Sequence, residues 1–236
     1  MNITNKLFSL LGFAEPITLK RFNGKNQLPE KVLLLSTNKQ VNNNIEQAII
    51  QRKLTIVKQN DDLVDKSIEA LVIDATSYND ESSYQRLFLV VQNSLKYLAN
   101  NARILVMAKA SSTKQSVEEN TFSQALIGFT KSLAKEVGRK GSTANIVFID
   151  DSDEENSTDT KVNVITALTS PISFFLSSKS AFVSGQLLTI NSQLITTKAL
   201  SCSSKQKRAL VTGAAQGIGA AIASKLTDDG YLVIGV

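Results

Sequence analysis

The sequence has no histidine and a single cysteine, Cys202, among its 236 residues. Without histidine the chain cannot form a Ser-His-Asp or Cys-His catalytic arrangement, and it lacks the most common metal ligand. One cysteine cannot form an internal disulfide, and a structural zinc site is not expected. We therefore predict no bound metal. The lone thiol fits a reducing, cytoplasmic location.

Long hydrophobic runs and clusters of one charge are also lacking. The longest apolar runs, such as Leu87–Val91, are far too short to cross a bilayer, and the N-terminus shows no export signal. The net charge of +5 is spread along the chain, without the basic stripe that nucleic-acid binding needs. We therefore expect neither a membrane nor a nucleic acid as partner.

Apolar runs instead alternate with amphipathic patterns, after a predicted helical segment over Thr4–Phe22. Continuous apolar runs are typical of parallel strands covered on both faces. The alternation predicts an α/β fold with a doubly wound parallel sheet of Rossmann or flavodoxin type. The predicted strands are Lys31–Ser36, Leu54–Lys58, Ala70–Ala75, Ala102–Ala108, Thr143–Ile149 and Gln186–Ile190, and the predicted helices are Asn42–Arg52, Ser82–Asn100, Val117–Gly138 and Lys161–Ser177.

Two of the predicted helices are apolar on more than one face. Ser82–Asn100 carries Leu87, Val91 and Leu98 on one side, with Phe88 and Leu95 beside them. Such a helix is either covered twice, by the sheet and by a second subunit, or buried over a wide face within one subunit. We expect a homodimer. In Val117–Gly138 the stripe predicted to face the sheet is Phe122, Leu126, Phe129, Leu133 and Val137.

A glycine-rich turn lies near the end of the sequence, between the predicted strand Arg208–Val211 and a predicted helix over Gly217–Leu226. Glycines there permit a tight turn and close backbone approach, and the free N–H groups of the helix face a pyrophosphate. In this context the pattern predicts a dinucleotide-binding element. An ordinary glycine turn in a βα unit is the alternative.

These patterns predict four parts. Residues 1–28 form an N-terminal helical segment, and residues 29–192 form a Rossmann-type domain. Residues 193–206, rich in Ser, Thr and Lys, form a linker. Residues 207–236 form the first βαβ of a second, truncated Rossmann unit, which we expect to be poorly held because it lacks the rest of a sheet.

Three stretches, Ala125–Glu136, Ser178–Ile190 and Thr212–Gly219, resemble the short-chain dehydrogenase/reductases. Their tandem order resembles the high-molecular-weight 3-oxoacyl-acyl-carrier-protein reductases, which place a degenerate reductase-like domain before a complete one. The resemblance implies NADH- or NADPH-dependent reduction of a 3-oxoacyl group on acyl-carrier protein or coenzyme A, in fatty-acid synthesis. It implies cofactor contacts at Thr212, Gly213, Gln216, Gly217, Ile218 and Gly219.

The first domain departs from the family at each signature. Ser36–Gln40, which follows the first strand, contains no glycine, and Ile73–Thr76 replaces the family's Asn-Asn-Ala-Gly turn. The resemblance places Glu119 at the catalytic tyrosine and Ser123 at the catalytic lysine, and neither can perform that role. We therefore expect no cofactor in the first domain and no activity from these 236 residues alone. The alternative function is a non-enzymatic scaffold or dimerisation module.

Overall fold

The computed structural model of the chain describes residues 17–25, 27–36, 42–58, 63–77, 81–111, 115–150, 158–191 and 207–236. It divides into two compact units, Met1–Ile195 and Thr196–Val236. The predicted linker, residues 193–206, lies outside the described residues. Each unit is considered by itself below.

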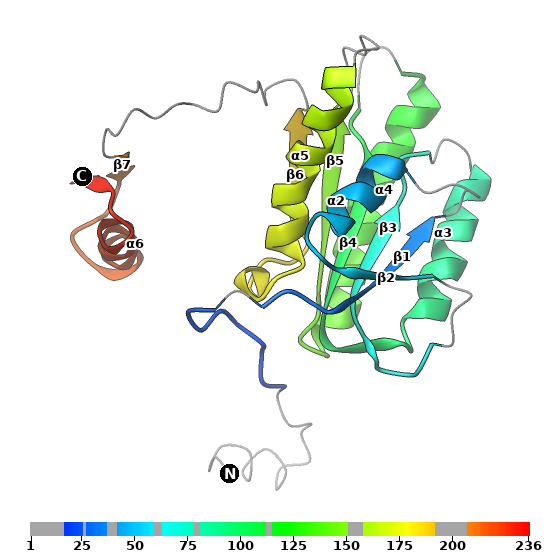
Figure 1. Cartoon of the computed structure of the whole chain (residues 1–236), viewed down its shortest axis with the longest axis horizontal. Coiled ribbons are helices and arrows are strands. Elements are labelled where there is room, and N and C mark those ends of the chain that lie inside the picture. The colour runs from blue at the N-terminus through cyan, green and yellow to red at the C-terminus, as the bar shows by residue number, and fades with distance from the viewer. Residues whose placement is uncertain are drawn as a thin grey trace, which may run out of the picture. The chain divides into compact units, whose positions relative to one another are not determined.

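The first unit contains a six-stranded sheet in the order β2-β1-β3-β4-β5-β6, and every neighbouring pair of strands is parallel (Figure 1). Parallel strands need crossover connections, and α-helices supply four of the five connections in this unit. The strands are β1 Lys31–Ser36, β2 Thr55–Val57, β3 Ile68–Asp74, β4 Leu98–Lys109, β5 Thr143–Asp150 and β6 Leu187–Asn191. The helices are α2 Asn43–Ile50, α3 Glu81–Ser94, α4 Val117–Gly138 and α5 Thr158–Phe175, and a short 3-10 turn, η1, covers Ser178–Ser180.

Helices cover both faces of the sheet, with α2 and α5 on one side and α3 and α4 on the other (Figure 1). Side chains along a strand alternate between these layers. On β4, Val106 packs in the core beneath α3 and α4, whereas Leu105 packs beneath α2 and α5. Double coverage explains the continuous apolar runs of the strands, and the predicted doubly wound parallel sheet is confirmed.

The boundary between α3 and β4 differs from the prediction. The helix ends at Ser94, and Leu98 already pairs with Ile68 of β3. The backbone N–H of Ile68 donates to the Tyr97 carbonyl at 2.9 Å, so the chain is drawn into the sheet one turn earlier than expected. The predicted helix over Ser82–Asn100 was therefore wrong beyond Ser94, because pairing with β3 overrides the helical pattern of Leu98.

Helix α4 has the predicted bounds, but its buried stripe is shifted by one residue at two positions. Phe122 and Phe129 are only half-buried beside the sheet, and the Phe122 ring stacks on Tyr84 with 5.3 Å between ring centroids. Smaller hydroxyl side chains, Ser123 and Thr130, occupy the two buried positions instead. The buried stripe is Ser123, Leu126, Thr130, Leu133 and Val137.

The segment before β1 is not helical where it is described. Residues 1–16 of the predicted helical segment lie outside the described residues, and residues 17–22 have no helical structure. Asn101 holds this segment extended: its side-chain Nδ2 donates to the Thr18 carbonyl at 3.2 Å, and its Oδ1 accepts from the Lys20 N–H at 3.0 Å. These bonds satisfy the backbone as a neighbouring strand would, so the prediction of a helix through Phe22 was wrong.

The second unit has two parallel strands, β7 Arg208–Val211 and β8 Leu232–Gly235, joined through helix α6 Gly217–Asp228. No residue of α6 is buried. Parallel strands are ordinarily covered on both faces, so these apolar side chains lack the neighbours that such strands have in complete sheets. The exposed ones are Leu210, Ile218, Ile222, Leu232, Ile234 and Val236.

Val106→Ala is expected to lower the free energy of unfolding of the first unit by about 2 kcal/mol, because two buried methyl groups are removed and a cavity remains. Val106 has no exposed surface. The matched control is Val64→Ala, whose side chain is 68% exposed and whose effect should stay within about 0.5 kcal/mol. Urea unfolding of both variants measures the difference. Equal effects would contradict the placement of Val106 in the core.

Candidate nucleotide-binding site

The six sequence-predicted contact residues lie together in the turn from β7 into α6. Val211 closes the strand and is buried, whereas Thr212, Gly213, Gln216, Gly217 and Ile218 are exposed. Three backbone bonds join the turn to Val236, the residue after β8. The Gly213 and Ala214 N–H groups donate to the Val236 carbonyl at 2.7 and 3.4 Å, and the Val236 N–H donates to the Val211 carbonyl at 2.9 Å. The structure therefore leaves five of the six predicted contact residues exposed, and Gly219 is partly buried.

Glycine is required at three places in this turn for two different reasons. Gly213 and Gly217 have φ of +66° and +62°, a conformation that side-chain-bearing residues rarely adopt, and the space where a Cβ would project is open. Gly219 is packed instead: an added Cβ would overlap the Gly213 carbonyl oxygen and lie 2.6 Å from its carbon. Two glycines thus leave the backbone approachable, and the third lets α6 lie directly on the turn.

The first turn of α6 is free to bind an anion. Its N-cap residue, Gln216, makes no side-chain hydrogen bond to the helix. The first N–H groups of a helix have no partner within the helix, and its dipole favours negative charge there. Bare N–H groups beside a glycine turn fit a dinucleotide pyrophosphate. The residues present therefore suit NADH or NADPH.

The corresponding place in the first unit carries a buried carboxylate. The strand order reverses between β1 and β3, and ligands of open α/β sheets bind outside the carboxyl ends at such a point. There the buried Asp74 carboxylate accepts from the Asn42 N–H at 2.7 Å, the Thr76 N–H at 3.1 Å and the Thr76 hydroxyl at 2.7 Å.

Asp74 thereby places a negative charge next to Asn42, the N-cap residue of α2. A cofactor phosphate at that helix end would meet a like charge at close range, which is unfavourable. The glycine-free stretch Ser36–Gln40 lies largely outside the described residues. The carboxylate at the end of β3 therefore argues independently against a phosphate in this position.

The two positions aligned with catalytic residues have structural partners. Glu119 closes a capping box at the start of α4: its Oε2 accepts from the Ser116 N–H at 2.9 Å, and its own N–H donates to Ser116 Oγ at 3.1 Å. The Ser123 hydroxyl lies within hydrogen-bonding distance of the Lys109 and Glu119 carbonyls, at 3.3 and 3.2 Å. Both side chains stabilise the helix start and leave no acid–base pair at these positions.

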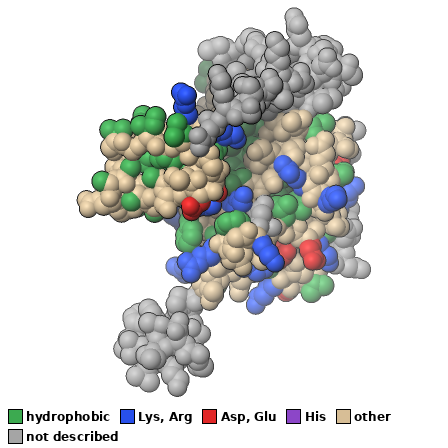
Figure 2. Space-filling view, turned by 60° about the vertical axis from the view of Figure 1, so that its left-hand side comes forward, with side chains coloured by type: hydrophobic (Ala, Val, Ile, Leu, Met, Phe, Trp, Pro, Cys, Tyr) green, Lys and Arg blue, Asp and Glu red, His purple; other side chains and the backbone are tan. Residues whose placement is uncertain are grey.

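Other kinds of site find no support among the described residues. No group of three or more His, Cys, Asp or Glu side chains is placed to hold a metal ion within the part of the chain that the structure covers. No helix there is long and apolar enough to cross a membrane. Figure 2 shows Lys and Arg side chains scattered over the visible face rather than gathered in a stripe.

Arg103 was not predicted from the sequence as a functional residue. The signal that could have indicated it is a charged residue inside an otherwise apolar strand.

Comparison with solved structures identifies proteins that share this fold. No protein-family model and no curated protein matches the chain. Solved structures do match. A double mutant of a short-chain dehydrogenase/reductase from Serratia marcescens shares 14% identity at a TM-score of 0.53, over 70% of this chain and 97% of that one.

Two further structures agree with it. A dehydrogenase/reductase from Sinorhizobium meliloti 1021 shares 15% identity at a TM-score of 0.51, over 75% of this chain and 97% of that one. The TT0495 protein from Thermus thermophilus shares 15% identity at a TM-score of 0.51, over 69% and 98%. Together with the parallel sheet and its helical layers, these matches show that the chain has the fold of the short-chain dehydrogenase/reductases.

Proposed function

We propose that the chain is the N-terminal part of an NAD(P)H-dependent 3-oxoacyl thioester reductase of fatty-acid synthesis, and that its second unit begins the catalytic domain. The observation that carries this proposal is the glycine turn of the second unit, with Gly213 and Gly217 open to a ligand and Gly219 closed against the turn. The exposed apolar side chains of β7, α6 and β8 support it, because more strands and helices would cover them.

In this proposal the turn binds and orients the cofactor. The N–H groups at the start of α6 would hold the pyrophosphate, and the missing side chains at Gly213 and Gly217 would let the backbone come close to it. A bound nicotinamide would supply the hydride that reduces a β-keto group carried by acyl-carrier protein or coenzyme A. Residues 17–191 contribute no acid–base chemistry at the Glu119 and Ser123 positions, because both side chains have structural partners there.

A second role is favoured by one surface of the first unit. On α3 the Phe88 and Leu89 side chains are 56% and 46% exposed, next to the buried face formed by Leu87 and Val91. Neighbouring exposed apolar residues on one helix are typical of a protein contact. We infer that α3 contributes to a homodimer contact, so that the first unit organises the assembly while the second holds the cofactor.

Titration of NADH and of NADPH into the 236-residue chain, followed by calorimetry, tests the glycine turn. We expect saturable binding of at least one cofactor, weakened at least tenfold in Gly217→Trp, because an indole at a positive φ blocks the approach to α6. Ala215→Ser, a change at an exposed position of the same turn, should bind like the wild type. Absence of binding would mean that the turn needs the rest of its sheet to hold the cofactor, and binding unchanged in Gly217→Trp would contradict the assignment.

The reductase assignment is tested by the gene from which the chain derives. If coding sequence continues beyond Val236, we expect a Tyr-x-x-x-Lys motif within about 150 residues, a typical domain length. The lysine would lower the tyrosine pKa and the tyrosine would protonate the carbonyl oxygen. A continuation of that length without the motif would exclude the reductase activity.

The dimer contact is tested by sedimentation or light scattering at several protein concentrations. We expect a dimer for the wild type and a shift toward monomer for Phe88→Ser, because a large apolar side chain leaves the contact. Val64→Ser, which removes an exposed apolar side chain from a loop, should leave the dimer unchanged. A wild-type chain that stays monomeric at high concentration would refute the contact.

A further inference from the structure

A cavity of about 270 Å³ opens at the amino edge of the first unit's sheet, opposite to the edge where nucleotides bind in such folds. It is lined by residues that precede β1, residues near the starts of β3 and β4, and residues that follow α5. The polar side chains that matter here are Lys20, Glu30, Glu69, Arg103 and Ser178. Neither the proposed cofactor site nor the proposed dimer contact uses any of them.

Arg103 is the unusual member of this group, because its side chain is charged yet the residue is only 4% exposed. Nη2 donates to the Lys20 carbonyl at 3.0 Å, and Nη1 makes a long contact of 3.5 Å to Thr143 Oγ1. A guanidinium has five N–H donors, so three have no partner among the described residues. Burial lowers the pKa of Arg103, which reflects the cost of holding this charge away from water.

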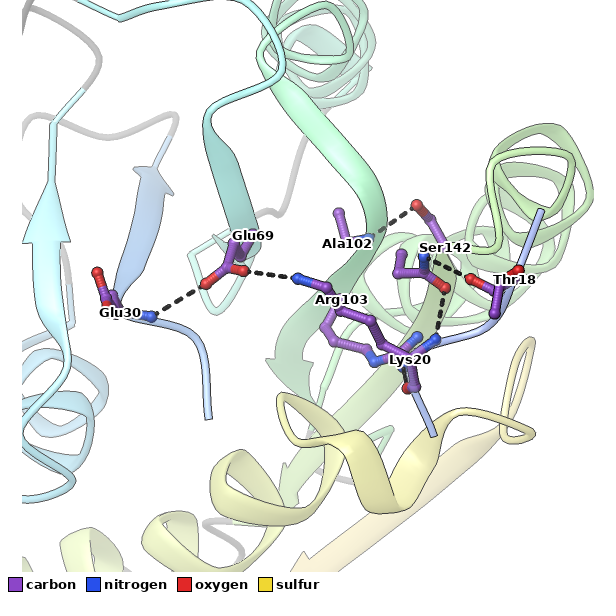
Figure 3. A network of polar contacts seen from close by, with 8 residues as sticks. Thr18, Lys20, Glu30, Glu69, Ala102, Arg103 and Ser142 are labelled. Atoms are coloured by element: carbon purple, nitrogen blue, oxygen red, sulfur yellow. Dashed lines mark hydrogen bonds and ion pairs between the residues drawn. The ribbon is translucent and has the colours of Figure 1, made fainter. Parts of the chain in front are cut away.

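No carboxylate of the described residues forms an ion pair with Arg103. Glu69, on the neighbouring strand β3, is engaged elsewhere (Figure 3): its Oε1 accepts from Lys20 Nζ at 3.0 Å and its Oε2 accepts from the Glu30 N–H at 3.2 Å. Burial raises the pKa of Glu69, but the bonds from Lys20 and Glu30 outweigh it, and the pKa is lowered overall. Buried charges in proteins are ordinarily paired, and Arg103 is not.

A second donor faces the same space. Ser178 lines the cavity, and its Oγ accepts from the Gln27 N–H at 3.3 Å, which leaves the hydroxyl proton available. We propose that the cavity binds a small molecule through one carboxylate or phosphate group, which accepts hydrogen bonds from the Arg103 guanidinium and the Ser178 hydroxyl. The bound anion supplies the missing charge partner. The cavity lies at the small end of ligand pockets, so the rest of the molecule must be compact.

The full 236-residue chain, titrated with sodium phosphate and separately with sodium acetate, tests this site. Sodium chloride keeps the ionic strength constant, so that general screening does not contribute. We expect saturable binding by calorimetry at millimolar concentration for at least one anion, with a matching rise in Tm, because a ligand of the folded state alone stabilises it. The anion that binds more tightly identifies the recognised group.

Two variants that should change the anion affinity in opposite directions distinguish binding in this cavity from general attraction of anions to the protein surface. Arg103→Gln should weaken binding at least tenfold, because it removes a charge-assisted hydrogen bond. Glu69→Gln should strengthen binding at least threefold, because it removes a like charge from the lining. The control is Arg21→Gln, which removes one positive charge from an exposed residue of the same extended segment and should change affinity less than twofold.

The proposal is overturned if phosphate and acetate both fail to bind saturably to the wild type and also fail to bind saturably to Glu69→Gln. It is also overturned if Arg103→Gln, shown to be folded by circular dichroism, binds like the wild type. Should Arg103→Gln fail to fold because the Lys20 carbonyl loses its donor, the result for Glu69→Gln decides. Unchanged or weaker binding in that variant would then refute the site.

Discussion

Burial of a parallel sheet on both faces is the constraint from which the rest of the first unit follows. Each central strand must be apolar on both sides, as Leu105 and Val106 of β4 are, because helical layers lie above and below it. Crossover connections then send all six strands in one direction. The carboxyl ends gather at one edge and the amino ends at the other, and these two edges carry the polar chemistry of the unit.

At the carboxyl edge, side chains stabilise structure in positions where the resembled family places chemistry. Asp74 satisfies three donors beside the start of α2, and Glu119 closes the capping box of α4. Each is a local solution to unpaired backbone or hydroxyl groups at the end of an element. Both contacts therefore hold the ends of elements in place at this edge of the sheet.

The amino edge is different, because its charges are incompletely balanced within the described residues. Lys20 and Glu69 pair with each other, while the buried guanidinium of Arg103 contacts only neutral oxygens. Arg103 also fixes the extended segment before β1 through the Lys20 carbonyl. The Arg103 side chain thus has two roles. It helps to fix the N-terminal segment, and its positive charge can be balanced by a bound anion.

The sequence by itself determined the parts that depend on local pattern. Continuous apolar runs predicted the strands and the doubly wound sheet, and the spacing of glycines predicted the turn between β7 and α6, because both follow from backbone geometry and period. Tertiary structure alone decided the features that depend on partners far apart in the sequence. Helix α3 stops before Leu98 because Leu98 pairs with Ile68 of β3. Residues 17–22 are extended rather than helical because Asn101 bonds to the backbone of that segment. Likewise, Arg103 and Glu69 are 34 residues apart in the sequence. Whether they form an ion pair depends on the side-chain positions that result when β3 and β4 lie side by side.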